Sequence, residues 1–170
     1  YSARKTVYDV ADPLFRFWYR FIPRYVSLLQ NGMLDPVCAR IMAQLPQYMG
    51  PVFEEICKQW LWRQNRRGVL PVLFTALGRW WGSDPRTKSE AEIDIVATGD
   101  GDHMLFCECK WTHEPVGGNV LATLTARSEL IRSGKRSYIL FARSGFTGGC
   151  RKAAEEMGTV RLVDFAAMLE

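Results

Sequence analysis

The spacing of apolar residues divides the chain into a helical first part and a mixed second part. Residues 1–48 show no strand-like alternation, and their two Asp-Pro pairs, at Asp12 and Asp35, have the residue order typical of a helix start. We therefore predict a helix from each pair and interpret 1–48 as a helical lead-in packed on a domain formed by 49–170. A further helix is predicted to begin after Gly50.

The second part alternates between helix and strand patterns. Apolar residues in 51–65 recur every three or four positions, which indicates one face of a helix. Strand patterns follow at 74–85, in a hairpin over 92–111, at 136–145 and at the start of 159–170, with helix patterns at 115–134, 146–158 and the C-terminal end. Trp80 and Trp81 in the first strand are expected to be packing residues. Hairpin-connected strands followed by crossover units predict an α/β fold, with a mixed sheet flanked by helices on both faces.

The predicted hairpin carries charged residues inside apolar strands. Asp94 lies between two isoleucines and Glu108 between two cysteines, although buried charge is costly unless it is paired or bound. Side chains alternate along a strand, so Glu108 and Lys110 share a face. A turn from Gly99 to His103 places Asp94 opposite Glu108. Because two facing acids repel, we expect at least one of them to titrate above its usual pKa.

The first helix of the second part offers a third acid. At about 100° per residue, Glu54 lies on the border of the apolar stripe and Glu55 points away from it. We therefore expect Glu54, and not Glu55, to face the hairpin acids. Mg²⁺ or Mn²⁺ between Asp94 and Glu108 would neutralise both, and Lys110 could orient or deprotonate an attacking water. The same spacing also fits a structural ion pair of Lys110.

Composition narrows the classes of function only slightly. A net charge of +4 permits contact with nucleic acid without requiring it. Two basic clusters, Arg66 with Arg67 and Lys135 with Arg136, are candidate nucleic-acid contacts or else solvated helix ends. No run approaches the roughly 18 apolar residues of a membrane span. The five cysteines lack a CxxC spacing, which favours free thiols in a reducing cytoplasm over a zinc site.

The segments FE, EIDIVA and CECKW, in this order, resemble the PD-(D/E)XK nuclease superfamily, which includes restriction endonucleases and archaeal Holliday-junction resolvases. The resemblance implies a restriction-endonuclease-like αβββαβ core. It places the superfamily's motif residues at Asp94, Glu108 and Lys110, with Glu54 as the helix acid. It also implies Mg²⁺ or Mn²⁺ as cofactor and DNA as substrate. Ile93 stands where the superfamily motif has a loosely kept proline.

A second resemblance covers nearly the whole chain. The segments YDVADPLFRFWYRFI, FEEICKQWL, GRWWG, EIDIVA, CECKW and YILFARSGF are similar to the C-terminal domain of unknown function of archaeal-type, AAA-family P-loop ATPases. This resemblance implies that a P-loop ATPase and a winged helix precede the domain, and a chain that starts at Tyr1 is expected to be a fragment of such a protein. In SGKRS, Lys135 is followed by Arg136 and lacks the upstream glycine of a P-loop, so ATP hydrolysis would belong to another part.

Two functions from different classes therefore stay open. The first is a metal-dependent nuclease-like domain that hydrolyses DNA phosphodiester bonds as the C-terminal module of a larger cytoplasmic ATPase. The second is a non-catalytic module that keeps the same fold to bind DNA or to dock a protein. The choice between DNA and RNA and the formation of a homo-oligomer are also left open by the sequence, and no membrane partner is expected.

Overall fold

The computed structural model describes residue 10 and the ranges 12–99 and 101–169. The chain divides into two compact units, Tyr1–Val52 and Phe53–Glu170, and the division falls inside one long helix. The packing of the lead-in on the core stays a prediction. No helix among the described residues is both long enough and apolar enough to cross a membrane.

Helices make up the described part of the first unit. They are α1 (Pro13–Phe21), the short 3₁₀ helix η1 (Pro23–Tyr25), α2 (Val26–Gln30) and the first half of α3 (Leu34–Arg67). The Asp12 carboxylate accepts hydrogen bonds from the backbone N–H groups of Leu14 and Phe15 at 2.7 and 3.2 Å, which confirms the first predicted helix start. The second predicted start, with Pro36 as the first helical residue, is wrong by two residues, because α3 already begins at Leu34 and Asp35 lies in its first turn. Proline is tolerated in a first turn, where its missing N–H is not needed.

The predicted break at Gly50 is also wrong. The helix α3 runs without interruption from Leu34 to Arg67 and contains Pro46 and Pro51. A proline inside a helix removes one backbone hydrogen bond and weakens the helix locally, but the turns on either side are long enough here to maintain it. The division between the two units lies directly after Pro51.

The second unit is built on a five-stranded mixed sheet with the strand order β1-β2-β3-β4-β5. Its elements are β1 (Ala76–Asp84), β2 (Ser89–Thr98), β3 (His103–Lys110), α4 (Gly118–Ser128), β4 (Lys135–Ala142), α5 (Gly148–Met157) and β5 (Val160–Asp164). The first three strands are antiparallel and the last three are parallel. This arrangement confirms the predicted α/β fold and αβββαβ order. The predicted terminal helix does not form, because turns follow β5 over 165–168.

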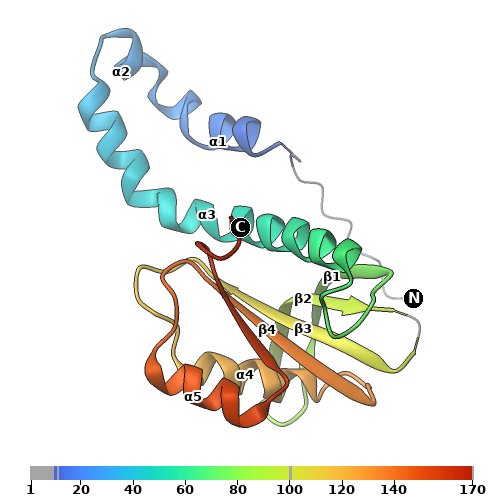
Figure 1. The fold of residues 1–170 in the computed structure, drawn as a ribbon. Helices are drawn as coiled ribbons and strands as arrows, with labels where there is room; N and C mark the ends of the chain where they lie inside the picture. Colours follow the sequence, from blue (N-terminus) through green and yellow to red (C-terminus); the bar gives the residue numbers. More distant parts are fainter. Residues whose placement is uncertain (1–9, 11, 100, 170) are drawn as a thin grey trace. The chain divides into compact units, whose positions relative to one another are not determined.

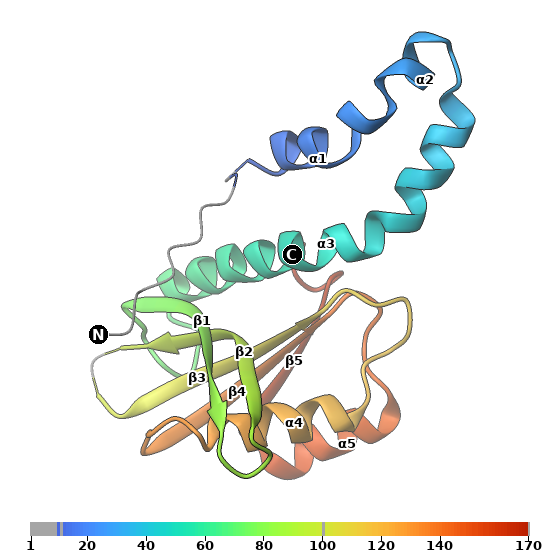
Figure 2. The same cartoon turned by 180° about the vertical axis from the view of Figure 1, so that it is seen from behind.

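Two apolar cores fill the two sides of this sheet, which lies between α3 on one side and α4 and α5 on the other (Figures 1 and 2). The core on the α3 side contains Phe53 and Leu61 of that helix, and the core on the α4 side contains Leu121 and Leu124. Trp80 packs against the second core. The same prediction for Trp81 is wrong, since this side chain is 69% exposed. Neighbouring residues on the edge strand β1 point to opposite faces, so only one of the two indoles reaches that core.

Candidate active site

A β-bulge in β2 lies at Asp94. The pairing of β1 with β2 shifts by one residue there, so that Asp94 and Ile95 together stand opposite the single residue Arg79. As a result, Ile93 belongs to the core on the α4 side and Ile95 to the core on the α3 side, although residues two apart share a face in a regular strand. Bulges re-aim side chains in this way, and this one sets the direction of the Asp94 carboxylate.

Asp94 also stands where β2 and β3 stop pairing. Their antiparallel ladder ends at Ile95 opposite Cys107, and the same register extended by one residue sets Asp94 opposite Glu108, as predicted. Beyond that point Asp94 Oδ2 accepts a hydrogen bond of 2.8 Å from the backbone N–H of Cys109. The carboxylate thus takes the role of a backbone acceptor and is fixed between the two strands.

Glu108 and Lys110 form a partly buried ion pair on β3. Lys110 Nζ donates to Glu108 Oε1 at 2.6 Å, and the Glu108 side chain is only 7% exposed. The other oxygen, Oε2, is buried and has no hydrogen-bond partner. Burial and the charge of Asp94 raise the pKa of Glu108, although Lys110 opposes the shift. This raised pKa agrees with the predicted repulsion between the facing acids. A buried, unpartnered carboxylate oxygen beside a second acid is suited to accept a cation.

The same environment shifts the pKa of Lys110. Burial lowers the pKa of its ammonium, but the hydrogen bond to Glu108 and the charges of Glu108 and Asp94 outweigh burial and raise that pKa. At neutral pH the lysine is therefore a cation held beside the two acids.

Glu54 on α3, and not Glu55, lies near Asp94, which agrees with the predicted helical phase. The prediction that it also faces Glu108 stays a prediction. The Glu54 carboxylate forms an ion pair with Arg79, whose guanidinium also binds Glu92 at 2.9 Å. Burial raises the pKa of Glu54; the Arg79 hydrogen bond lowers it, and the nearby charge of Asp94 raises it further. Glu55 is half exposed and pairs within its own helix instead. Sequence reasoning missed Arg79, and no spacing in the sequence marks it as a partner of two acids.

The acids do not all converge on one point. Among the described residues, no group of three or more His, Cys, Asp or Glu side chains lies close enough to hold a metal ion. Arg79 holds Glu54 and Glu92, which leaves Asp94 and Glu108 as the two carboxylates at the lysine. Mg²⁺ uses one or two protein carboxylates together with waters and phosphate oxygens, so this pair fits such an ion.

Arg127 in the last turn of α4 is a second functional candidate that sequence reasoning missed. Its Nη1 donates to the backbone carbonyl of Glu92 at 2.9 Å. Its charge lowers the pKa of both Glu108 and Lys110. The residue is separated from the hairpin motif in the chain, and only the packing of α4 on the sheet brings it close.

Two of the four predicted nucleic-acid contacts lie at the other end of the sheet. Lys135 pairs with His103, seven residues before Lys110, which is about 23 Å along the strand at roughly 3.3 Å per residue. Arg136 donates to the backbone carbonyl of Ile131 at 2.9 Å and is partly buried. The structure therefore does not bring this cluster to the acids.

Arg66 and Arg67 are exposed at the end of α3. Arg66 comes twelve residues after Glu54, which corresponds to about 18 Å along the helix at roughly 1.5 Å per residue. These two arginines also lie apart from the acids, so one substrate phosphate could not contact both groups.

The cysteines of the sheet are core thiols, as predicted. Cys107 is fully buried, and Cys109 packs against the same core as Cys57 of α3. Burial raises the pKa of the Cys107 and Cys109 thiols well above their ordinary value. They are protonated at neutral pH and are not poised as nucleophiles.

Comparison with known proteins places the chain in a family. It is 34% identical over 111 residues to the uncharacterized protein MJECL04 of Methanocaldococcus jannaschii, a match that covers 65% of this chain and 24% of that protein. The chain thus spans about a quarter of the length of this curated relative.

Among solved structures, the protein of unknown function AF1548 aligns with a TM-score of 0.44 at 20% identity, over 65% of this chain and 58% of that one. The DNA modification-dependent restriction endonuclease AspBHI aligns with a TM-score of 0.36 at 14% identity, over 73% of this chain and 34% of that one. Residues 18–124, more than half of the chain, match the model of DUF234, so the chain belongs to this family of archaeal and bacterial proteins of unknown function.

Proposed function

We propose that the second unit is a metal-dependent phosphodiesterase that hydrolyses DNA, and that it acts as the C-terminal module of a larger cytoplasmic ATPase. The observation that carries the proposal is the buried Glu108 carboxylate, which has one oxygen on Lys110 and the other without a partner, next to Asp94. The αβββαβ order around these residues agrees with the fold that the resemblance to PD-(D/E)XK nucleases implies. The much greater length of the curated relative agrees with a module of a larger protein.

Each side chain would have a separate task. Asp94 and Glu108 would hold Mg²⁺ or Mn²⁺, which supplies Lewis acidity and lowers the pKa of a bound water. Asp94 is fixed for this task by the Cys109 N–H, and Glu108 by Lys110. The Lys110 ammonium would orient the attacking water and stabilise negative charge on the phosphate. Arg79 holds Glu54 near Asp94, where the helix acid would bind a water of the site.

A specific observation also favours the alternative, a non-catalytic module that binds DNA or docks a protein. Arg79 forms ion pairs with both Glu54 and Glu92, so the two acids that flank Asp94 already have a partner within the protein. A decayed site in which an arginine replaces the charge of a metal would have this arrangement. The two proposals can be distinguished because only the first requires the cleavage of DNA.

A cleavage assay separates them. The protein is incubated with Mg²⁺ or Mn²⁺ and single-stranded, duplex, flap and junction DNA, and the products are resolved by gel electrophoresis. We expect cleavage of at least one DNA by the wild type, and its loss in Lys110→Ala and Asp94→Asn. Lys152→Ala is the matched control, because this exposed lysine of α5 pairs with Glu156 on its own helix. Binding of DNA without cleavage under any of these conditions would establish the non-catalytic module instead.

A further inference from the structure

Arg127 lies on the side of the sheet to which the acid and lysine of β3 point. Phe106 belongs to the core on the α4 side, and Glu108 and Lys110 follow it at two-residue spacing on the same strand. Leu124 of α4 is buried in that same core, and Arg127 lies three residues further along the helix, on the same side. The guanidinium therefore belongs to the face that carries the Glu108–Lys110 pair.

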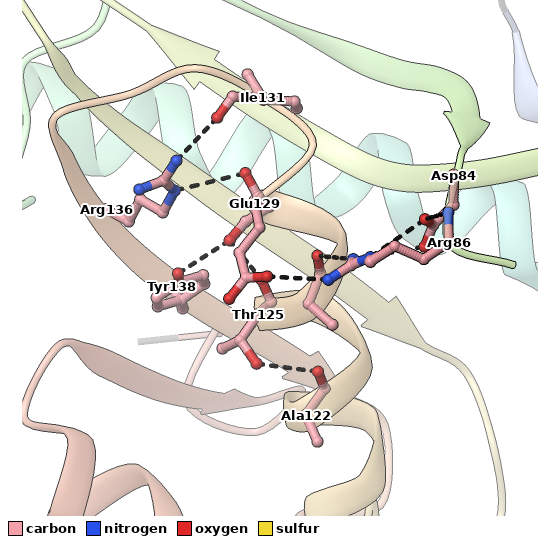
Figure 3. A network of polar contacts seen from close by, with 10 residues as sticks. Asp84, Arg86, Ala122, Thr125, Glu129, Ile131, Arg136 and Tyr138 are labelled. Atoms are coloured by element: carbon pink, nitrogen blue, oxygen red, sulfur yellow. Dashed lines mark hydrogen bonds and ion pairs between the residues drawn. The ribbon is translucent and has the colours of Figure 1, made fainter.

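The position of Arg127 is fixed from two directions. Its own Nη1 is held at 2.9 Å by the carbonyl of Glu92, two residues before Asp94. The helix around it is tied to the hairpin of β1 and β2 by Arg86, which binds Glu129 at 3.1 Å and the carbonyl of Ala126 at 3.0 Å (Figure 3). An arginine on so well-anchored a helix end loses little freedom when it binds a ligand.

Arg127 forms no ion pair with any residue that the structure describes, although its charge acts on the pKa of Glu108. Arg79 and Arg86 differ in this respect, because each pairs with a carboxylate. A guanidinium has five N–H donors, and the Glu92 carbonyl takes one nitrogen. A helix C-terminus favours a cation, and this effect explains a positive residue here. It does not explain why the cation is turned toward the sheet and bound to the strand that carries Asp94.

An open pocket gives solvent access to the guanidinium. Arg127 lines it together with the hydroxyl residues Thr87, Ser89 and Thr123, between the β1–β2 hairpin and α4. Two acids, Asp84 and Glu90, also line this pocket, and Asp84 is paired with Arg86. Hydroxyls beside a free guanidinium are common ligands of phosphate oxygens.

We propose that Arg127 binds a backbone phosphate of a nucleic-acid strand next to the bond that the Asp94, Glu108 and Lys110 site would cleave. The inference rests on the proposed function for its substrate class. It adds a contact from α4 that positions the strand and is independent of any metal ion. The phosphate would bind to the donors that the Glu92 carbonyl leaves available.

The test measures binding separately from cleavage. Fluorescence anisotropy with labelled single-stranded and duplex DNA, in EDTA and at several salt concentrations, gives the Kd and its salt dependence for each variant. Arg127→Gln keeps an N–H donor for Glu92 but loses the charge, so we expect binding to weaken about tenfold to a hundredfold. The slope of log K against the logarithm of the salt concentration should decrease in magnitude by about one, which corresponds to the loss of one phosphate contact. Arg127→Lys should retain most of the slope, and Arg132→Gln, an exposed arginine after α4, should match the wild type.

A second measurement needs no variant and covers the case in which Arg127→Gln does not fold. Phenylglyoxal modifies accessible arginines, and mass spectrometry reports the rate at each position with and without DNA. Bound DNA should protect Arg127 and leave Arg132 reactive. Equal modification of Arg127 in both samples, or equal affinity of Arg127→Gln and Arg132→Gln, would overturn the inference.

The outcomes also distinguish this inference from the proposed function. If DNA binding depends on Arg127 but no DNA is cleaved in the presence of either metal ion, the proposed phosphodiesterase activity is wrong and the phosphate contact is confirmed. If the Arg127→Gln variant cleaves and binds DNA like the wild type, the phosphodiesterase activity is confirmed and the phosphate contact is wrong. A wild-type protein that binds no DNA would overturn both.

Discussion

At the residue scale, the candidate site depends on where one carboxylate is directed. Asp94 lies in a bulge, and its Oδ2 accepts the Cys109 N–H that the regular ladder no longer pairs with a carbonyl. The bulge lets an acid lie between two strands without leaving a backbone donor unsatisfied. Glu108 does not have this compensation, because its Oε2 is buried without a partner. The electrostatic cost of the site is therefore concentrated on Glu108.

This cost predicts a pH dependence of stability in the absence of divalent metal. Burial and Asp94 raise the pKa of Glu108 above its ordinary value of 4.5, so the native state holds this proton more tightly than the unfolded chain does. The free energy of unfolding should therefore fall as the pH rises from the unfolded pKa through the raised native pKa. Glu54 contributes with the same sign, since burial also raises its pKa.

Urea denaturation in EDTA, between about pH 4 and pH 7, measures this dependence. In Glu108→Gln the group cannot titrate, so the fall in unfolding free energy should be shallower than in the wild type. Other groups titrate in both proteins, and the difference between the two curves therefore isolates Glu108. Parallel curves would show that Glu108 has an ordinary pKa in the native protein.

At the element scale, Arg86 joins the turn of the β1–β2 hairpin to the end of α4, in addition to the bond between Arg127 and the Glu92 carbonyl. Arg86 binds Asp84 in its own turn at 3.2 Å, and it reaches across to Glu129 and to the carbonyl of Ala126 on α4 (Figure 3). On the other side of the same helix, the Ser128 hydroxyl shares a hydrogen bond of 3.0 Å with the Tyr138 hydroxyl of β4. The end of α4 thus joins the hairpin to the parallel half of the sheet.

Arg86→Ala should loosen this junction without unfolding the unit. The ion pairs are exposed, so the loss of global stability should be small. Amide hydrogen exchange should nevertheless become faster in the turn over 84–89 and in the last turn of α4, because these segments lose their shared anchor. Lys152→Ala, which removes an exposed ion pair within α5, is the control and should leave both segments unchanged. Unaltered protection in Arg86→Ala would mean that apolar packing and the bond between Arg127 and the Glu92 carbonyl hold the hairpin on α4 without Arg86.

At the scale of the whole molecule, every residue of the candidate site belongs to the second unit. Glu54 enters it through the part of α3 that follows Pro51, and Asp94, Glu108 and Arg127 come from three further elements of the same unit. A ligand at the site should therefore stabilise this unit as a whole, since it binds only where these elements have come together.

The change in stability on adding a divalent metal ion tests this expectation. Mg²⁺ or Mn²⁺ at about a hundred times its Kd should stabilise the native protein by about 2.7 kcal/mol and raise its melting temperature. Asp94→Asn should lose most of this shift because it removes one of the two charges at the ion. Its metal-free stability should stay close to that of the wild type, since the asparagine oxygen can still accept the Cys109 N–H and the repulsion with Glu108 is gone. An equal metal-induced shift in both proteins would place the metal elsewhere.

The sequence by itself determined the features that depend on local spacing. Strand alternation and the hairpin turn were sufficient to set Asp94 opposite Glu108 and to place Lys110 beside it. The helical phase was sufficient to distinguish Glu54 from Glu55. These features follow from the fixed periods of helix and strand, which decide the direction of a side chain within its own element. The αβββαβ order followed from the same periods.

Only the tertiary structure decided which elements meet. The bulge at Asp94 is a property of the pairing with β1, and nothing in β2 alone indicates it. Arg79 and Arg127, which sequence reasoning missed, became partners of the site through strand pairing and helix packing. Lys135 and Arg66, which the sequence offered as candidate contacts, lie far from it. The physical reason is that contacts between elements depend on the burial of apolar surface summed over the whole unit. This packing determines where a charged residue lies in the folded unit, and the residues next to it in the chain do not predict that position.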